Sequence, residues 1–119
     1  MSTYQSLLVW QKSMDLVTSV YSMTKTFPRD EIFGLISQIR RCVVSIPSNI
    51  AEGKRRSSDS EFRRFLHYAY ASGAELETQL LIAKNLVYIS QIDFEKINGT
   101  LEEVMKMLNV LIQTVSDNV

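Results

Sequence analysis

Apolar residues recur along the chain at steps of three and four positions, which places them on one face of an α-helix. The first such segment spans residues 4–25. Its apolar face, together with the residue that follows the helix, consists of Val9, Leu16, Val20, Met23 and Phe27. Phe27 precedes Pro28, and a residue before proline avoids helical backbone angles. The pattern therefore predicts a helix that ends ahead of Pro28.

The second segment contains a proline in an otherwise helical pattern. It begins near Asp30, a residue type that caps helices well, and runs to Gly53. Its apolar positions are Leu35, Ile39, Val43, Ile46 and Ile50. Pro47 removes one backbone hydrogen bond, so it either kinks one long helix or divides two short ones. Because the apolar repeat continues in phase past Pro47, we expect one helix with a kink.

The third segment follows a polar loop over residues 54–57. Ser58 and Glu61 have the spacing of a capping box, in which the hydroxyl and the carboxylate each accept a hydrogen bond from a backbone N–H. The helix is expected to continue to about Ile89, with an apolar face formed by Phe62, Phe65, Ala69, Gly73, Leu76, Leu80, Ala83 and Val87. Ala69 and Gly73 are small, which indicates either the close approach of a neighbouring backbone or an ordinary packing gap.

The fourth segment has the most regular pattern. Its heptad repeat consists of Phe94, Ile97, Leu101, Val104, Leu108, Leu111 and Val115. Ser90 is a suitable cap, but Gly99 in the first turns costs about 1 kcal/mol relative to alanine, which favours fraying or a later start. Four long helices with short connections predict an all-α fold. We expect an up-down-up-down four-helix bundle, formed as a single domain over residues 1–119.

Composition is that of a small globular protein and bears on its location. The chain has 119 residues, 45% of them hydrophobic, which suits one domain with its own core. It shows neither a signal-peptide pattern nor an apolar run of the roughly 20 residues that a membrane span needs. The single cysteine, Cys42, cannot form an internal disulfide, which fits a reducing compartment. We therefore expect a cytoplasmic protein with no membrane contact.

The residues that catalysis and metal binding require do not occur in a recognisable arrangement. Cys42 and His67 are the only residues of their types, and Cys42 lies near the apolar face of the second helix. This position favours a buried structural thiol over a nucleophile. A lone histidine does not form a zinc site without further ligands at suitable spacing, and the four glycines are too scattered for a phosphate-binding loop. We expect no enzyme activity, no metal and no cofactor.

Two polar stripes lie beside the apolar faces of the second and third helices. The second-helix stripe consists of Gln38, Arg41, Ser45, Asn49, Glu52 and Arg56. The third-helix stripe consists of Tyr68, Ser72, Glu75 and Gln79. Two interpretations stay open. The stripes are solvated faces, or they meet within a subunit or between subunits, with Arg41 pairing to a carboxylate such as Glu75.

The net charge is zero, but the charges are unevenly distributed. Residues 29–64 carry eight Lys and Arg against five Asp and Glu, whereas residues 65–119 carry three against seven. What we call the basic corner, between the second and third helices, consists of Lys54, Arg55, Arg56, Arg63 and Arg64. Five clustered cations suit phosphate, although a solvated loop can carry the same charges. Few aromatic residues flank the corner in the sequence, which argues against base stacking.

Several motifs together resemble one protein family. The run FPRDEIFGLISQIRRCVVSIPSNIAEGKRRSS, followed by EFRRFLHYAYASGAELETQL, resembles the bacterial four-helix-bundle family named after the intervening sequence of large-subunit ribosomal RNA genes. The opening LLVWQKSMDLV resembles the first helix of that family. The positions that match the family signature are Gln38, Arg41, Ser45, Pro47, Asn49, Glu52, Gly53, Arg56, Ser57 and Glu75.

The resemblance implies a left-handed bundle that assembles into a ring-shaped homopentamer. The family is similar in architecture to the accessory variability determinant proteins of diversity-generating retroelements, which are basic pentamers that bind nucleic acid and a reverse transcriptase. It supplies no catalytic residues. The leading hypothesis is therefore a non-enzymatic homo-oligomer that binds RNA or DNA through repeated basic corners. The alternative is an oligomeric protein-interaction scaffold that binds no nucleic acid.

Overall fold

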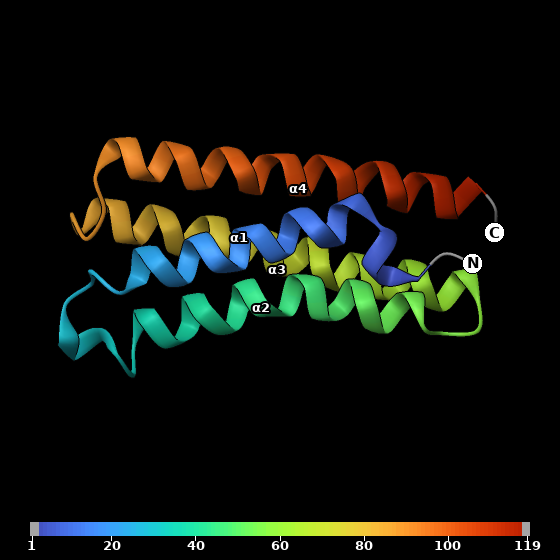
Figure 1. Ribbon diagram of the computed structural model, residues 1–119, viewed down its shortest axis with the longest axis horizontal. Helices are drawn as coiled ribbons and strands as arrows, with labels where there is room; N and C mark the ends of the chain where they lie inside the picture. The colour runs from blue at the N-terminus through green and yellow to red at the C-terminus, as the bar shows by residue number, and fades with distance from the viewer. Residues whose placement is uncertain (1–2, 118–119) are drawn as a thin grey trace.

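The computed structural model of the protein describes residues 3–117, which form four long helices. They are α1 (Leu8–Thr24), α2 (Leu35–Lys54), α3 (Asp59–Asn85) and α4 (Gln91–Asp117). Two short 3-10 helices, η1 (Tyr4–Ser6) and η2 (Arg29–Glu31), precede α1 and α2. Successive long helices run in opposite directions, and the described residues contain no strand (Figure 1). The predicted all-α four-helix bundle is confirmed, whereas its left-handed twist stays a prediction.

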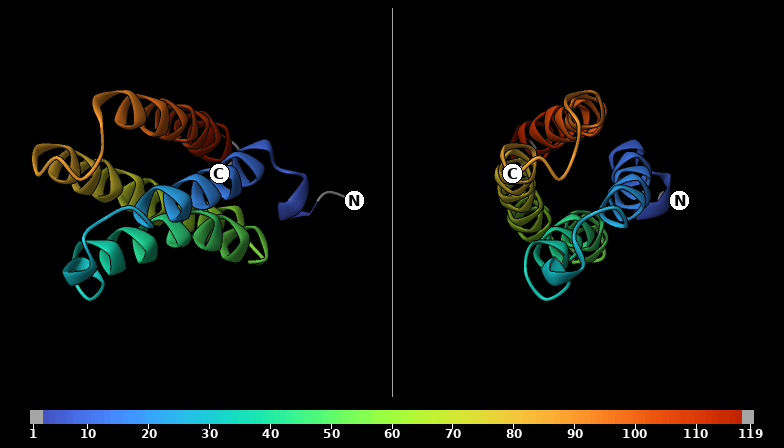
Figure 2. Two further views of the ribbon diagram at one scale, coloured as in Figure 1. Left: turned by 60° about the vertical axis from the view of Figure 1, so that its left-hand side comes forward. Right: turned by 90° about the vertical axis from the view of Figure 1, so that its left-hand side faces the viewer.

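Each helix packs against two of the other three. Among the described residues, α1 and α3 are each in contact with α2 and α4, whereas no Cα atoms of the diagonal pairs lie within 8 Å of each other. The right-hand view of Figure 2 looks along the bundle and shows the four helices around a common centre. The bundle measures 45 × 24 × 21 Å, so its length is that of a single long helix. One end of the bundle carries the connection between α2 and α3. The opposite end carries the connections from α1 to α2 and from α3 to α4 (Figure 1).

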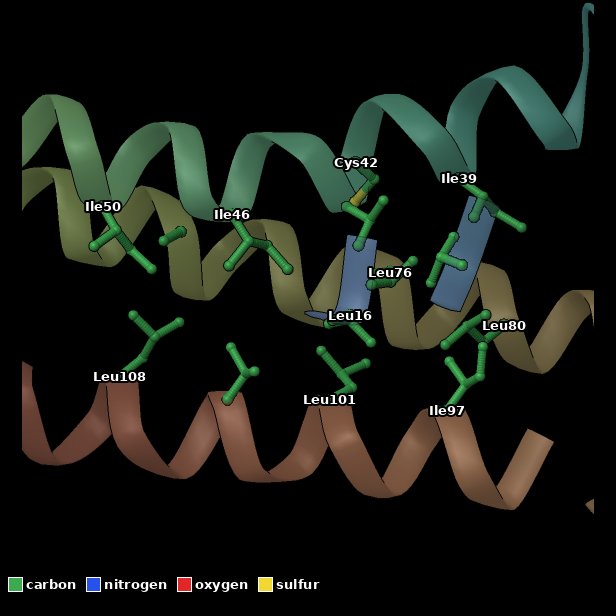
Figure 3. Close-up of a cluster of buried hydrophobic side chains, with 14 of the residues drawn as sticks. Leu16, Ile39, Cys42, Ile46, Ile50, Leu76, Leu80, Ile97, Leu101 and Leu108 are labelled. Atoms are coloured by element: carbon green, nitrogen blue, oxygen red, sulfur yellow. The ribbon is translucent and has the colours of Figure 1, made fainter. Parts of the chain in front are cut away.

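One continuous apolar core fills the centre of the bundle. Figure 3 shows side chains from the four helices meeting there, among them Leu16 of α1, Ile46 of α2, Leu76 of α3 and Leu101 of α4. All four are at most 1% exposed. Removing a side chain of this size from water contributes about 2 kcal/mol. The helical repeats read from the sequence thus become the inner faces of the helices.

Pro47 lies inside α2 without dividing it. The helix is continuous from Leu35 to Lys54, so the interpretation as two short helices is wrong. The Pro47 ring is buried, and its nitrogen has no hydrogen to donate to the carbonyl of Val43. The apolar face of α2 continues in phase past Pro47, and the free energy gained by burying this face outweighs the loss of one backbone hydrogen bond. The predicted kink at this position stays a prediction.

The first two long helices begin later than expected, because each is preceded by a short 3-10 turn. The α1 helix starts at Leu8, not at residue 4, and α2 starts at Leu35, not at Asp30. The N-cap residue of α2 is Gly34. The Glu31 carboxylate accepts hydrogen bonds from the N–H of Leu35, the first residue of the helix, at 3.1 Å and from the Tyr88 hydroxyl at 2.7 Å. These bonds hold the pKa of Glu31 below its usual value, the Leu35 bond contributing most. Glu31 thereby links the two connections at this end of the bundle.

The third helix ends earlier than expected, at Asn85. Val87 adopts a left-handed backbone with φ of 60°, and its N–H donates to the Lys84 carbonyl at 3.0 Å. The Tyr88 N–H donates to the Ala83 carbonyl at 2.9 Å, which completes a Schellman motif. Val87 is 83% exposed, so its predicted place on the apolar face is wrong. A β-branched residue seldom takes this conformation, which is why the sequence did not indicate the stop.

A single contact explains the start of α4, and another explains the glycine at position 73 of α3. The Ser90 hydroxyl accepts a hydrogen bond from the Asp93 N–H at 3.1 Å, and α4 begins directly afterwards at Gln91. Gly99 therefore does not delay the helix. On α3, the space that a side chain would need at Gly73 is filled by the side chain of Met105 from α4. A neighbouring side chain, and not a neighbouring backbone, requires the small residue there.

Candidate nucleic-acid interface

The basic corner is built by the end of α2 and the start of α3. Ser58 caps α3 as predicted, because its hydroxyl accepts a hydrogen bond from the Glu61 N–H at 3.1 Å. The Glu61 carboxylate, however, binds the Arg64 guanidinium through two contacts, of 3.0 and 2.9 Å. Only the Ser58 half of the predicted capping box is therefore confirmed. Glu61 raises the pKa of Arg64, chiefly through the hydrogen bond that joins them.

The five cations of the basic corner are only partly neutralised. Arg64 is paired with Glu61, and Arg56 lies 3.8 Å from Glu52. Within residues 3–117 the other three cations form no ion pair; they are Lys54, Arg55 and Arg63. With Asp59 included, five positive charges face three negative ones along residues 52–64. Exposed ion pairs of this kind contribute little to stability. The net charge of +2 over residues 52–64 favours the binding of phosphate.

Aromatic rings lie beneath most of these cations, contrary to the expectation from the sequence. Within α3, the Phe65 ring centroid is 4.7 Å from the Arg56 guanidinium and 5.3 Å from that of Arg64, and Arg64 also lies 5.9 Å from the Tyr68 ring. Lys54 is 5.3 Å from the centroid of Phe62. Such contacts fix flexible cations in place. Phe62 and Phe65 stand directly beside Arg63 and Arg64 in the sequence, so the statement that few aromatic residues flank the corner was wrong.

A further ring comes from the other end of the chain. The Tyr4 ring in η1 lies with its centroid 5.3 Å from the Arg55 guanidinium and 5.3 Å from the Trp10 ring. Between η1 and the end of α2 is a hollow of about 230 Å³, which we call the Tyr4 hollow. It is lined by Thr3, Tyr4, Gln5, Lys54 and Arg55. Some fifty residues separate its two sides in sequence, so no local pattern could have indicated it.

Gly53 sets how closely α2 and α3 approach each other at the basic corner. It is buried, and a Cβ atom at this position would lie 2.6 Å from Cβ of Phe65 and 3.3 Å from the carbonyl oxygen of Phe62. The Cβ atom of Phe65 is bonded directly to the backbone of α3, and the carbonyl oxygen of Phe62 is part of that backbone. Neither atom can therefore move away by a side-chain rotation. The glycine therefore serves a close contact, and its backbone φ is not positive.

The two polar stripes meet within one chain. The hydroxyl oxygens of Ser45 and Ser72 are hydrogen-bonded at 2.7 Å, and the Asn49 amide donates to the Ser45 carbonyl at 2.8 Å. On α3, the Gln79 amide donates to the Glu75 carboxylate at 3.1 Å. The hydrogen bond between Ser45 and Ser72 thus joins the second-helix stripe to the third-helix stripe, and neither stripe is wholly a solvated face.

Arg41 and Glu75 border the same hollow between these stripes but do not pair. The hollow has a volume of about 250 Å³ and is lined by Gln38, Arg41, Cys42, Ser45 and Glu75. Over residues 3–117 no ion pair joins Arg41 to a carboxylate, so the hypothesis of an Arg41–Glu75 pair within one chain is wrong. Both side chains are exposed, and solvation competes with an attraction of this kind.

Cys42 is one of the residues that line this hollow, and it is a buried structural thiol. It is 5% exposed, and its thiol donates to the Ser72 carbonyl at 3.0 Å. Burial raises the pKa of Cys42 to about 12, and the nearby negative charge of Glu75 adds to the effect. The thiolate form that a nucleophile needs is therefore strongly disfavoured.

Cys42 is expected to resist thiol reagents in the folded protein. A rise in pKa from 9.0 to about 12 lowers the thiolate fraction near neutral pH about a thousandfold. Labelling with an aromatic disulfide reagent should therefore be slow in buffer and fast in denaturant. Labelling of the folded protein at the rate of a free cysteine would contradict the burial described here.

Comparison with known proteins identifies the family. The sequence pattern of the 23S rRNA-intervening sequence protein family matches residues 5–110. The chain belongs to this family. The resemblance drawn from the SQIRR, SIPSNIAEG and AELET motifs is thereby confirmed, and the matched range spans all the residues of the basic corner and both polar stripes.

The family fold is also seen in a solved structure. A protein of unknown function from the S23 ribosomal protein family of Bacteroides thetaiotaomicron superposes with a TM-score of 0.82. The two sequences are 26% identical, and the match covers 89% of this chain and 96% of that chain. No curated protein matches the chain. Among the described residues, no helix is long and apolar enough to cross a membrane, and no three His, Cys, Asp or Glu side chains gather as a metal site.

Proposed function

We propose that this member of the 23S rRNA-intervening sequence protein family is a non-enzymatic homopentamer that binds RNA or DNA through repeated basic corners. The observation that carries the proposal is the group of four corner cations held over aromatic rings, two of which, Lys54 and Arg55, have no carboxylate partner among residues 3–117. Phosphate contacts supply most of the affinity in non-specific nucleic-acid binding. Positioned guanidinium groups are well suited to such contacts.

Three further points support the proposal. The name of the family refers to an intervening sequence in 23S rRNA, which makes ribosomal RNA the first ligand to test. Cys42, the residue best suited to nucleophilic chemistry, is buried and protonated, which favours a binding role over a catalytic one. A reduced lone thiol and an RNA ligand both fit a protein of the cytoplasm.

Self-association is supported by an apolar hollow between α1 and α4. Its volume is about 380 Å³, and its apolar lining consists of Leu7, Leu8, Val9, Met107, Val110 and Leu111. Leu8 is 60% exposed and Val110 67%. Contiguous exposed apolar residues on a protein surface mark contact sites. In a pentamer, each corner would add to the overall affinity for one nucleic-acid strand.

The same hollow favours a second candidate function. An oligomeric protein-interaction scaffold would use the apolar surface between α1 and α4 and would leave the basic corner in solvent. The two functions differ in one measurable respect, since only the first requires an affinity for polyanions that falls with salt.

Replacing Lys54, Arg55 and Arg56 together by Ser is expected to weaken binding of labelled 23S rRNA fragments. If each cation neutralises one phosphate, the slope of log affinity against log salt should fall by about 2 to 3 per chain. Fluorescence anisotropy between about 50 and 200 mM salt measures both quantities. The matched control replaces Lys25, Arg29 and Lys96, which are exposed and lie outside both the corner and the apolar hollow, by Ser.

Each outcome of this experiment distinguishes between the candidates. Loss of affinity and slope in the corner variant, with the control variant close to wild type, supports the proposal. Equal losses in both variants would remove the corner as the site. A wild-type protein that assembles but binds no RNA or DNA at low salt would leave only the scaffold function.

A further inference from the structure

The Tyr4 hollow is formed in advance by contacts that hold η1 against the end of α2. The Gln11 amide donates to the Gln5 carbonyl at 2.9 Å, and Tyr4 meets the Trp10 ring at an interplanar angle of 68°. The η1 segment contacts both α1 and α2. Figure 1 shows this segment near the turn between α2 and α3. Contacts within the chain therefore position the segment that forms one side of the hollow.

The chemistry of the hollow combines positive charge with flat π surfaces. Arg55 is exposed, has no carboxylate partner in the described part of the chain, and lies over the Tyr4 ring with its guanidinium 5.3 Å from the ring centroid. A guanidinium held against an aromatic ring keeps its in-plane N–H donors and can stack a second planar group. Lys54 adds a compact positive charge to the same lining. A ligand that matches both features has a flat ring joined to a phosphate.

We propose that the Tyr4 hollow holds one unpaired nucleotide of a single-stranded RNA or DNA. The base stacks on the layer formed by Arg55 and Tyr4, and the adjoining phosphate lies at Lys54. The inference rests on the proposed function and refines it, because it names the form of nucleic acid that the corner prefers. It also reverses the expectation against base stacking, which did not take Tyr4 into account.

A preference for single strands follows from the accessibility of bases. In a duplex both faces of each base are covered by its neighbours, so only phosphates would reach Lys54 and Arg55. In a single strand a base can leave its neighbours and stack on a protein ring. Stacking on one aromatic group changes affinity by about tenfold or somewhat more. Tyr4 should therefore matter for single strands and not for duplexes.

Three labelled probes of equal length test the inference on the full chain: oligothymidylate, oligouridylate, and a duplex of oligothymidylate with oligoadenylate. Tyr4→Leu keeps apolar bulk but removes the phenol ring and its π surface. It is expected to weaken binding of both single strands about tenfold and to change duplex binding less than about twofold. A comparison of the two single strands shows whether RNA or DNA is preferred.

The matched control is Tyr21→Leu. Tyr21 also lies under an arginine, Arg40, at 4.6 Å, but it belongs to α1 and is not part of the Tyr4 hollow. Its replacement should leave the affinity for all three probes unchanged. An equal effect of both substitutions, or no effect of Tyr4→Leu on the single strands, would overturn the inference.

A second measurement keeps the inference testable if Tyr4→Leu fails to fold. Ultraviolet crosslinking of a thiouridine-containing single strand to the wild-type protein should place the crosslink at residues 3–5 or at Lys54 and Arg55. Crosslinks confined to other residues would refute it. If the protein binds duplex and single strand alike and the corner variant loses both, base stacking is wrong while the proposed function stands. If no probe binds, both fail.

Discussion

Gly53→Ala is expected to lower the free energy of unfolding by about 2 kcal/mol, although alanine is ordinarily the better helix former by about 1 kcal/mol. The added methyl group would lie 2.6 Å from Cβ of Phe65 and 3.3 Å from the Phe62 carbonyl oxygen. Forced overpacking of this kind costs about 3 kcal/mol when the backbone must move. A decrease in Tm of about 8 °C follows for a chain of this size. Urea unfolding followed by circular dichroism measures the change.

Gly99→Ala is the matched control for that substitution. Gly99 also lies within a long helix, α4, but a Cβ atom there would meet no atom of another helix within 4 Å. Here only helix propensity acts, so alanine should stabilise the protein by about 1 kcal/mol. Opposite signs for the two glycine substitutions would establish that contact with α3 requires Gly53. A stabilising effect at both positions would show that α2 can move away from α3 at little cost.

Val110→Glu is expected to convert the proposed pentamer into single chains of 13.6 kDa. Val110 lines the apolar hollow between α1 and α4, and a carboxylate enclosed by a second subunit there would lose its hydration without gaining a partner. The free chain should fold as before, because the side chain is 67% exposed. Light scattering measures the mass, and thermal unfolding at low protein concentration measures the stability of the chain.

Ile92→Glu provides a control on the same helix. Ile92 is 69% exposed, close to the value for Val110, but it lies at the opposite end of α4 and outside the hollow. This variant should keep the mass of the wild-type protein. If Val110→Glu also keeps that mass, the hollow between α1 and α4 is not the contact surface. A wild-type mass of one chain would remove the pentamer altogether.

The helices were predictable because periodicity within one segment is enough to define them. The inner faces of α2 and α4 follow directly from residues such as Ile46 and Leu101, which are fully or almost fully buried. Caps made by a local hydroxyl, as at Ser58 and Ser90, were predictable for the same reason. The contact of Glu31 with the first N–H of α2 was not predictable, because Glu31 also accepts a hydrogen bond from Tyr88, far away in the sequence.

One part of the candidate site was likewise predictable from the sequence, and another part was not. The cations of the basic corner are close together in the sequence, and the fold keeps them together. Tyr4 joins Lys54 and Arg55 only because α1 and α2 are antiparallel, which brings the start of one beside the end of the other (Figure 1). The absent Arg41–Glu75 pair is a different case, since helical spacing placed both residues correctly. Spacing does not determine whether two exposed side chains prefer each other to water.

An even number of antiparallel helices has a practical consequence for handling the protein. The η1 segment and the last turn of α4 lie at the end of the bundle that carries the turn between α2 and α3, and hence the basic corner (Figure 1). An affinity tag or fluorescent domain joined near either segment would stand beside the surface under study. For immobilisation on a sensor, an engineered attachment point at Phe33, which is 96% exposed in the turn before α2 at the far end, would present the corner to solution.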